Sequence, residues 1–270
     1  MSRTGIAVED TELYFAQEDR SQTRANLNPN SVYGDTPDQT LLVGLESQEE
    51  FALSGEASGV HLSTLDGYPD APLEALAEYA CELEAYVNAN QGTGWTFTES
   101  ERDKTFNGVI ESVSWRRAAG EPFTLEWDMS VMWAQATMAS GAHSPESFSL
   151  GGTPTLAGQD LGAVDETQVE REQDIEQYPV ALADPGQNQA LANSGVIREV
   201  TIVGRITDES RRNTFDDNIQ QNMGNDTIVT YEEPFPGRTL QGMIQDFDST
   251  RTAGLTRIGE YQLTFVEGQR

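Results

Sequence analysis

The chain has 270 residues and is strongly acidic, because 45 Asp and Glu face 16 Lys and Arg, for a formal net charge of −29. This length can bury a substantial core, as one large domain or two small ones. The charge excludes a conventional nucleic-acid-binding protein, which needs a basic surface to displace phosphate counterions. It does not exclude a passage through which DNA slides.

The shortage of lysine is a second compositional signal. Lys104 is the only lysine, and the other basic residues are arginines. A charge excess of this size makes a compact chain repel itself, whereas at about 1 M salt the Debye length falls to roughly 3 Å and the repulsion is screened. The composition resembles that of haloarchaeal proteins, so we expect a halophilic protein that assembles in very salty cytoplasm.

The N-terminal stretch to about Pro37 is interpreted as an arm. It lacks the apolar segment of a signal peptide, and no run in the chain approaches the 18 or so apolar residues of a membrane helix. The first clear element is an amphipathic helix with Asp70 as N-cap and Pro72 in its first turn. Its apolar positions are Leu73, Leu76, Ala80, Leu83 and Val87. Cys81 lies between them and is expected to pack as a small hydrophobe.

Alternating strands follow this helix. The alternation covers Trp95 to Phe97, Phe106 to Val113, and Phe123 to Met132. Residues 139–193 are rich in Gly, Ser, Pro and acidic residues, which predicts an exposed arm and linker.

The same order returns after residue 193. Phe215, Ile219 and Met223 predict a shorter helix, capped by Thr207 or Asp208 and stopped by Gly224. Strands are predicted around Ile228 to Thr230, Leu240 to Phe247, and Glu260 to Val266.

The chain repeats itself at a constant offset, which sets Lys104 against Arg238. Residues 104–131 align without a gap on 238–265, with seven of 28 positions identical. Two weaker matches, 51–55 with 200–204 and 7–12 with 163–168, fall in the same order. We therefore predict a mainly β protein with two tandem copies of a β-α-β-β domain, at 1–138 and 194–270, joined by the linker.

Repeated glycines and arginines are the candidate fold or subunit-contact residues. They are Gly108 and Gly242, Gly120 and Gly254, and Arg117 and Arg251. Each arginine precedes an Ala-Gly turn. One reading is a bidentate contact with a carboxylate at a subunit seam. The other is pairing within its own domain to hold the turn.

The sequence offers little for catalysis. It has two histidines, His61 and His143, one cysteine, and no phosphate loop, nucleophile elbow, cysteine pair or calcium loop. His61 lies in an apolar run and is expected to be structural. We expect no enzymatic activity, no cofactor and no metal site.

The order of strand, strand, helix and long hairpin, ending in the strand Tyr261 to Glu267 after Gly254 and Gly259, resembles the tail tube proteins of tailed viruses. This resemblance implies a β-sandwich with a flanking helix, whose inner sheet joins its neighbours in a ring. For the duplicated type it implies homotrimeric rings of six domains, stacked into a tube in the virion that conducts DNA without specific binding. Implied partners are other copies of the chain and the tape measure, baseplate and tail terminator proteins.

Two alternatives stay open from the sequence. A distal tail or baseplate hub protein has the same fold but makes one ring instead of a stack. A halophilic two-domain carbohydrate-binding or adhesion module would use tryptophans as stacking platforms, namely Trp95, Trp115, Trp127 and Trp133. In the tail tube interpretation, the N-terminal arm and the insert around 151–184 are expected to make ring-to-ring contacts.

Overall fold

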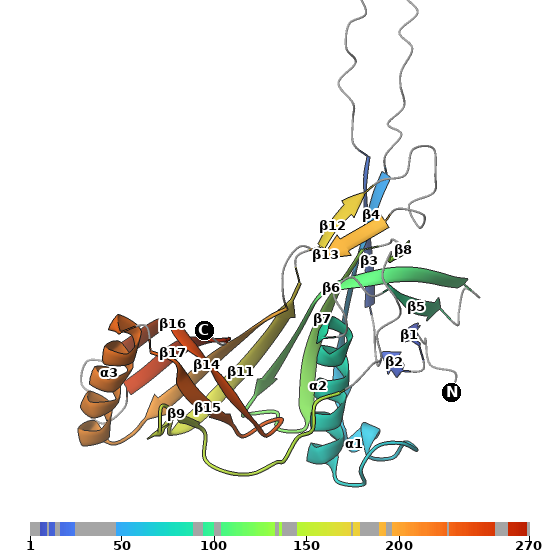
Figure 1. Ribbon diagram of the computed structural model, residues 1–270. Coiled ribbons are helices and arrows are strands. Elements are labelled where there is room, and N and C mark those ends of the chain that lie inside the picture. The colour runs from blue at the N-terminus through green and yellow to red at the C-terminus, as the bar shows by residue number, and fades with distance from the viewer. Residues whose placement is uncertain are drawn as a thin grey trace, which may run out of the picture.

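The structure is a computed structural model. It describes residues 6–9, 11–13, 17–24, 47–88, 94–99, 104–132, 135–136, 145–173, 175–178, 189–192, 196–225, 227–251 and 259–268. Within these ranges the protein is mainly β, which confirms the predicted class. A 14-stranded sheet runs through both halves of the chain, and a smaller sheet of three strands lies beside it (Figure 1).

The first half contributes seven strands to the large sheet and two helices. They are β1 (Ile6–Val8), β2 (Thr11–Leu13), β3 (Gln17–Arg24), β4 (Ser47–Ser58), α1 (Gly59–Leu62), α2 (Pro72–Asn88), β5 (Gly94–Glu99), β6 (Lys104–Ala118) and β7 (Thr124–Met132). The order across the sheet is β3, β4, β7, β6. The short strands β5, β1 and β2 continue from the first part of β6.

The second half repeats this arrangement. It contains β9 (Thr155–Leu156), β10 (Gln159–Asp160), β11 (Ala163–Glu172), β14 (Ile197–Ile206), α3 (Glu209–Gly224), β15 (Val229–Glu233), β16 (Arg238–Arg251) and β17 (Gly259–Glu267). The order is β11, β14, β17, β16, and β15, β9 and β10 continue from the first part of β16. The small sheet comprises β8 (Gln135–Ala136), β12 (Ile175–Tyr178) and β13 (Gln189–Ala192).

Strand registers confirm the predicted alignment of 104–131 with 238–265. Trp95 pairs with Gly108 in the first half, as Val229 pairs with Gly242 in the second. The weaker match of 51–55 with 200–204 is also confirmed. Its register pairs are Leu53 with Met129 and Ile202 with Leu263.

A β-bulge interrupts both copies at the same place. It lies between Ile110 and Ser112 where β6 pairs with β7, and between Ile244 and Asp246 where β16 pairs with β17. The second bulge falls where the alignment of the two halves places it. Because a bulge is a specific local irregularity that fixes register, its repetition shows that the two halves share one fold.

The third predicted match, of 7–12 with 163–168, is wrong. Val8 of β1 pairs with Phe97. Phe97 is equivalent to Tyr231 in the second half, and Tyr231 pairs with Leu156 of β9. The hairpin β1–β2 therefore corresponds to the hairpin β9–β10, and β11 corresponds to β3. The two segments are short and acidic, so their sequences look alike although their positions in the fold are not equivalent.

Both predicted long helices are present. In α2 the apolar stripe is confirmed, since Leu76, Ala80, Leu83 and Val87 are fully buried. The helix lies over β6 and β4 and also contacts β11 of the second half (Figure 1). In α3, Phe215 and Ile219 face β14 and β16, and the Arg211 backbone N–H lies 3.4 Å from the Asp208 side chain at the N-terminus.

Two segments predicted as arms belong in part to the large sheet. Strands β1 to β3 lie within the expected N-terminal arm, and β9 to β11 lie within the expected linker. Val8, Leu13, Leu156 and Leu161 are buried, so these pieces fill the core and are not exposed arms. Residues 25–37 and 179–188, also part of those predictions, lie outside the described residues.

Candidate assembly interface

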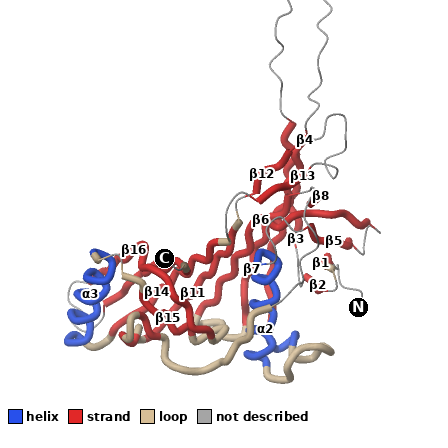
Figure 2. Tube along the Cα trace, viewed as in Figure 1, coloured by secondary structure: helices blue, strands red, loops and turns tan. Residues whose placement is uncertain are grey.

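The two halves join edge to edge through β6 and β11 (Figure 2). Residues 112–118 of β6 pair antiparallel with residues 172–166 of β11. The ladder continues at both ends, because Ala119 N–H donates to the Asp165 carbonyl at 2.7 Å and Gln173 N–H donates to the Glu111 carbonyl at 2.9 Å. We call this pairing the closed seam.

A buried ionic cluster stands behind the closed seam. Its members are Glu84, Glu146, Arg171, Arg198, Glu233, Arg238 and Glu267, and we call it the Glu84 cluster. Glu84, on α2, is the member that comes from the first repeat. The three arginines come from β11, β14 and β16 of the second repeat. The cluster therefore joins α2 to the second-half strands of the large sheet.

Glu84 is the centre of this cluster. Its carboxylate accepts two hydrogen bonds from Arg238, at 2.9 and 3.0 Å, one from Arg198 Nε at 3.0 Å, and one from Trp115 Nε1 at 2.8 Å. Four donors match the roughly four lone-pair sites of a carboxylate. A buried charge that is this fully paired stays ionised.

Electrostatics within the cluster sets the Glu84 pKa. Burial favours the neutral acid, but attraction by Arg238 and Arg198 outweighs burial and lowers the pKa to about 2. A carboxyl whose pKa is lower in the folded state stabilises the fold above its ordinary titration range. That contribution is lost as the pH falls from about 4.5 towards 2.

Glu233 behaves in the opposite way. It is fully buried, and only its Oε2 accepts hydrogen bonds, both from Arg238, at 2.9 and 3.0 Å. Burial, together with repulsion by Glu84, raises its pKa to about 7 despite the attraction of Arg238. The cluster holds three arginines and four glutamates, so a proton on Glu233 balances its charge.

Two exposed ion pairs lie near the closed seam, one across it and one within the second half. Arg116 donates to Glu166 at 2.7 Å across β6 and β11, and Arg205 makes a two-pronged contact with Asp165 at 2.6 Å. These four side chains are between 29% and 49% exposed, so molar salt screens their attraction. The buried part of the Glu84 cluster, namely Glu84, Glu233 and the three arginines, is screened much less.

Arg117 connects its own turn to the second half. Its Nε donates to the Pro122 carbonyl at 3.1 Å, and its guanidinium lies 4.6 Å from the centre of the Phe235 ring. Burial lowers its pKa. Within the chain, its described contacts are therefore with its own turn and with an aromatic ring across the closed seam. The contact with a carboxylate at a subunit seam stays a prediction.

The repeated glycines have different surroundings. A Cβ on Gly108 would lie 2.6 Å from a Val131 methyl group, and one on Gly242 would collide with the Val266 carbonyl. Both positions therefore need glycine for close strand packing. Gly120 has open space around it. Gly254 lies outside the described residues, and for Arg251 only the strand position is described.

Two strand edges are open where the closed seam has its counterparts. By register, β3 corresponds to β11, and residues 246–251 of β16 correspond to 112–117 of β6. Among the described strands, β3 pairs only with β4, and this part of β16 pairs only with β17. Within the described residues, the chain thus has one closed seam and two strand edges that are equivalent to its two sides.

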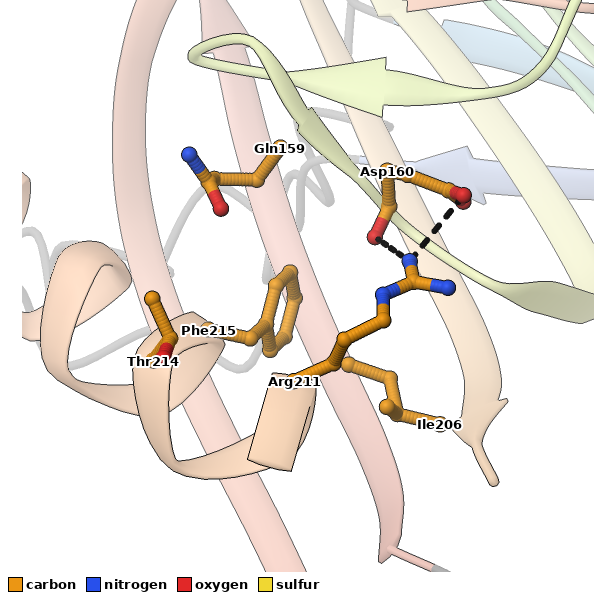
Figure 3. Close-up of a pocket in the computed structure, with 6 residues that line it drawn as sticks. All are labelled: Gln159, Asp160, Ile206, Arg211, Thr214 and Phe215. Atoms are coloured by element: carbon orange, nitrogen blue, oxygen red, sulfur yellow. Dashed lines mark hydrogen bonds and ion pairs between the residues drawn. The ribbon is translucent and has the colours of Figure 1, made fainter. Parts of the chain in front are cut away.

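Several surface hollows are lined by residues of the second half. One of about 550 Å³ lies between α3 and the β9–β10 hairpin, and Figure 3 shows Arg211 reaching across it to Asp160 at 3.0 Å. In the ranges that the structure describes, no group of three His, Cys, Asp or Glu could hold a metal ion. No described helix is long and apolar enough to cross a membrane.

The chain matches no protein-family profile and no curated protein. Two similar solved structures come from the virion of a native gene transfer agent particle and from the C6-symmetric tail of an empty one. Their identities are 13% and 14%, both at a TM-score of 0.32; each alignment covers 42% of this chain, and 85% and 82% of theirs. At this similarity, neither match assigns a function to this chain.

Proposed function

We propose that this chain is a structural subunit of a viral tail tube, in which three copies close a ring of six repeats and rings stack around a DNA channel. The observation that carries the proposal is the closed seam, in which one repeat already joins the next edge to edge within a single chain. Among the described strands, β3 and residues 246–251 of β16 are equivalent in position to the two strands of the closed seam, and each pairs on one side only. A contact between unlike surfaces repeats from copy to copy and closes a ring when the rotation allows.

Burial of the tryptophans favours assembly over carbohydrate binding. Trp95, Trp115 and Trp127 are at most 4% exposed, so these three cannot serve as stacking platforms; Trp133 lies outside the described residues. An acidic lumen would repel phosphate and let DNA pass without sticking. We therefore infer that the protein acts through its shape and its charge, without catalysis. In this proposal the second repeat begins near β9 and not at residue 194.

Electron microscopy of the purified protein in molar KCl, at increasing concentration, tests the proposal. We expect rings with a central channel that stack into tubes. Single rings at every concentration would favour a distal tail or baseplate hub protein. A strictly monomeric protein would contradict the proposal and favour the binding module.

A further inference from the structure

We infer that the subunit seam forms between β16 of one copy and β3 of the next, antiparallel, with Arg251 directly opposite Glu18. This inference rests on the proposed function, since it specifies the surface through which the ring closes. It assigns a register and named residue pairs to an interface whose partner is a second copy of this chain.

The closed seam supplies the register, because residues 112–117 of β6 lie opposite 172–167 of β11. The bulges map β6 onto β16, with Ile110 equivalent to Ile244. The pairs Arg20–Phe51 and Val169–Val200 map β3 onto β11. When the register of the closed seam is applied to the equivalent residues of β16 and β3, residues 251–246 of one copy lie opposite residues 18–23 of the next.

Charges on the two edges independently favour this register. In it, no directly opposed pair carries like charges, and Arg251 stands opposite the acidic residue Glu18 in register. A slip of two residues in one direction sets Arg251 opposite Arg20. The same slip in the other direction sets Asp248 opposite Asp19. Like charges directly opposite each other destabilise a strand pair.

One-residue slips fail for another reason. A shift of one residue moves every side chain of one strand to the opposite face of the sheet. In the closed seam the faces are distinct, because Val113 and Trp115 are buried while Arg116 is exposed. The continuous sheet therefore requires an even register, and the charges disfavour the two nearest even alternatives to the one that the closed seam supplies.

A paired-cysteine experiment tests the register. The double variant Ser21→Cys/Asp248→Cys should form chain-to-chain disulfides under mild oxidation in assembled protein, giving a ladder on non-reducing gels. Cys81 is buried with its pKa raised to about 12, so it should stay out of the reaction. The matched control is Ser114→Cys/Glu170→Cys, the equivalent pair of the closed seam, which should close within one chain.

Slipped pairs provide the contrast. Ser21→Cys/Thr250→Cys and Asp19→Cys/Asp248→Cys should cross-link at least about tenfold more slowly than the registered pair. Rings in micrographs with faster cross-linking of a slipped pair, or with none, would overturn the register and leave the proposed function standing. Absence of both rings and cross-links would overturn both.

A charge exchange gives a second readout. Arg251→Glu and Glu18→Arg should each shift ring formation to higher protein concentration, and the double variant should restore it. Failure of the double variant to recover, when each single variant is impaired and folded by circular dichroism, would contradict the pairing of Arg251 with Glu18.

Discussion

The closed seam and the two open edges are built from equivalent strands but from different side chains. On the closed seam, Trp115, Val169 and Arg171 are buried against the other half. The equivalent residues on the open edges are Ser249 of β16, and Arg20 and Gln22 of β3. An edge that meets water before assembly must avoid indiscriminate pairing, and polar and charged residues serve that purpose.

The arginines of the Glu84 cluster show the same asymmetry. Register places Glu49, Gln22 and Lys104 where the second half has Arg198, Arg171 and Arg238. A buried cluster suits a seam that forms once, during folding. The proposed subunit seam would form from solvated edges, so it would rely on backbone pairing and a few opposed charges.

The largest expected effect comes from breaking the closed seam at its centre. Glu84→Gln should destabilise the fold by about 3–5 kcal/mol, because it leaves buried arginines without their counter-charge. Urea unfolding in molar KCl measures the loss. The matched control is Glu78→Gln on the same helix, whose side chain lies outside the cluster and should change stability by under about 0.5 kcal/mol. Equal losses in both variants would show that the cluster does not hold the halves together.

A smaller effect compares one position in the two halves. Gly242→Ala should cost about 1–3 kcal/mol, because the added methyl group meets the backbone of Val266. Gly108→Ala should cost less, because its nearest neighbour is a Val131 methyl group that can move. Gly120→Ala, with open space, serves as the baseline. The reverse order of the two losses would show that the halves do not pack as their registers indicate.

Sequence patterns predicted the long elements because those elements bury one face regularly. Helix α2, strands β6 and β16, and the alignment between these two strands follow from the periodicity of apolar residues. The hairpins β1–β2 and β9–β10 were not predicted, because strands of two or three residues are too short to show a periodic pattern of apolar residues. Strand β11 escaped because only two of its ten residues are buried among many charges.

The Glu84 cluster could not be predicted from the helix alone. The pattern indicated one apolar stripe facing one sheet, but Ala77 and Glu84 are buried as well. The reason is tertiary: the second half covers what would otherwise be the solvent side of α2. A glutamate next to Leu83 in an apolar stretch was the available signal, and among 45 acidic residues it did not stand out.

The last expected effect depends on pH and concerns Glu233. Because its pKa is raised to about 7, the folded protein keeps a proton there that the unfolded chain releases above about pH 4.5. Its stabilising contribution therefore falls as the pH rises through this window, by on the order of 1 kcal/mol per pH unit. Glu233→Gln cannot release the proton, so relative to the wild type it should gain stability between pH 5 and pH 8.

The neighbour Glu232 is the matched control for this prediction. It lies on the same strand but faces solvent, where it accepts a hydrogen bond from Thr155 at 3.0 Å. Glu232→Gln removes an equal charge and measures the general benefit of making an acidic protein less acidic. Urea unfolding at pH 5 and pH 8 should show a pH-dependent gain for Glu233→Gln beyond that of Glu232→Gln. Identical pH profiles for the two variants would mean that Glu233 is ionised in the cluster, and that the closed seam carries an uncompensated negative charge.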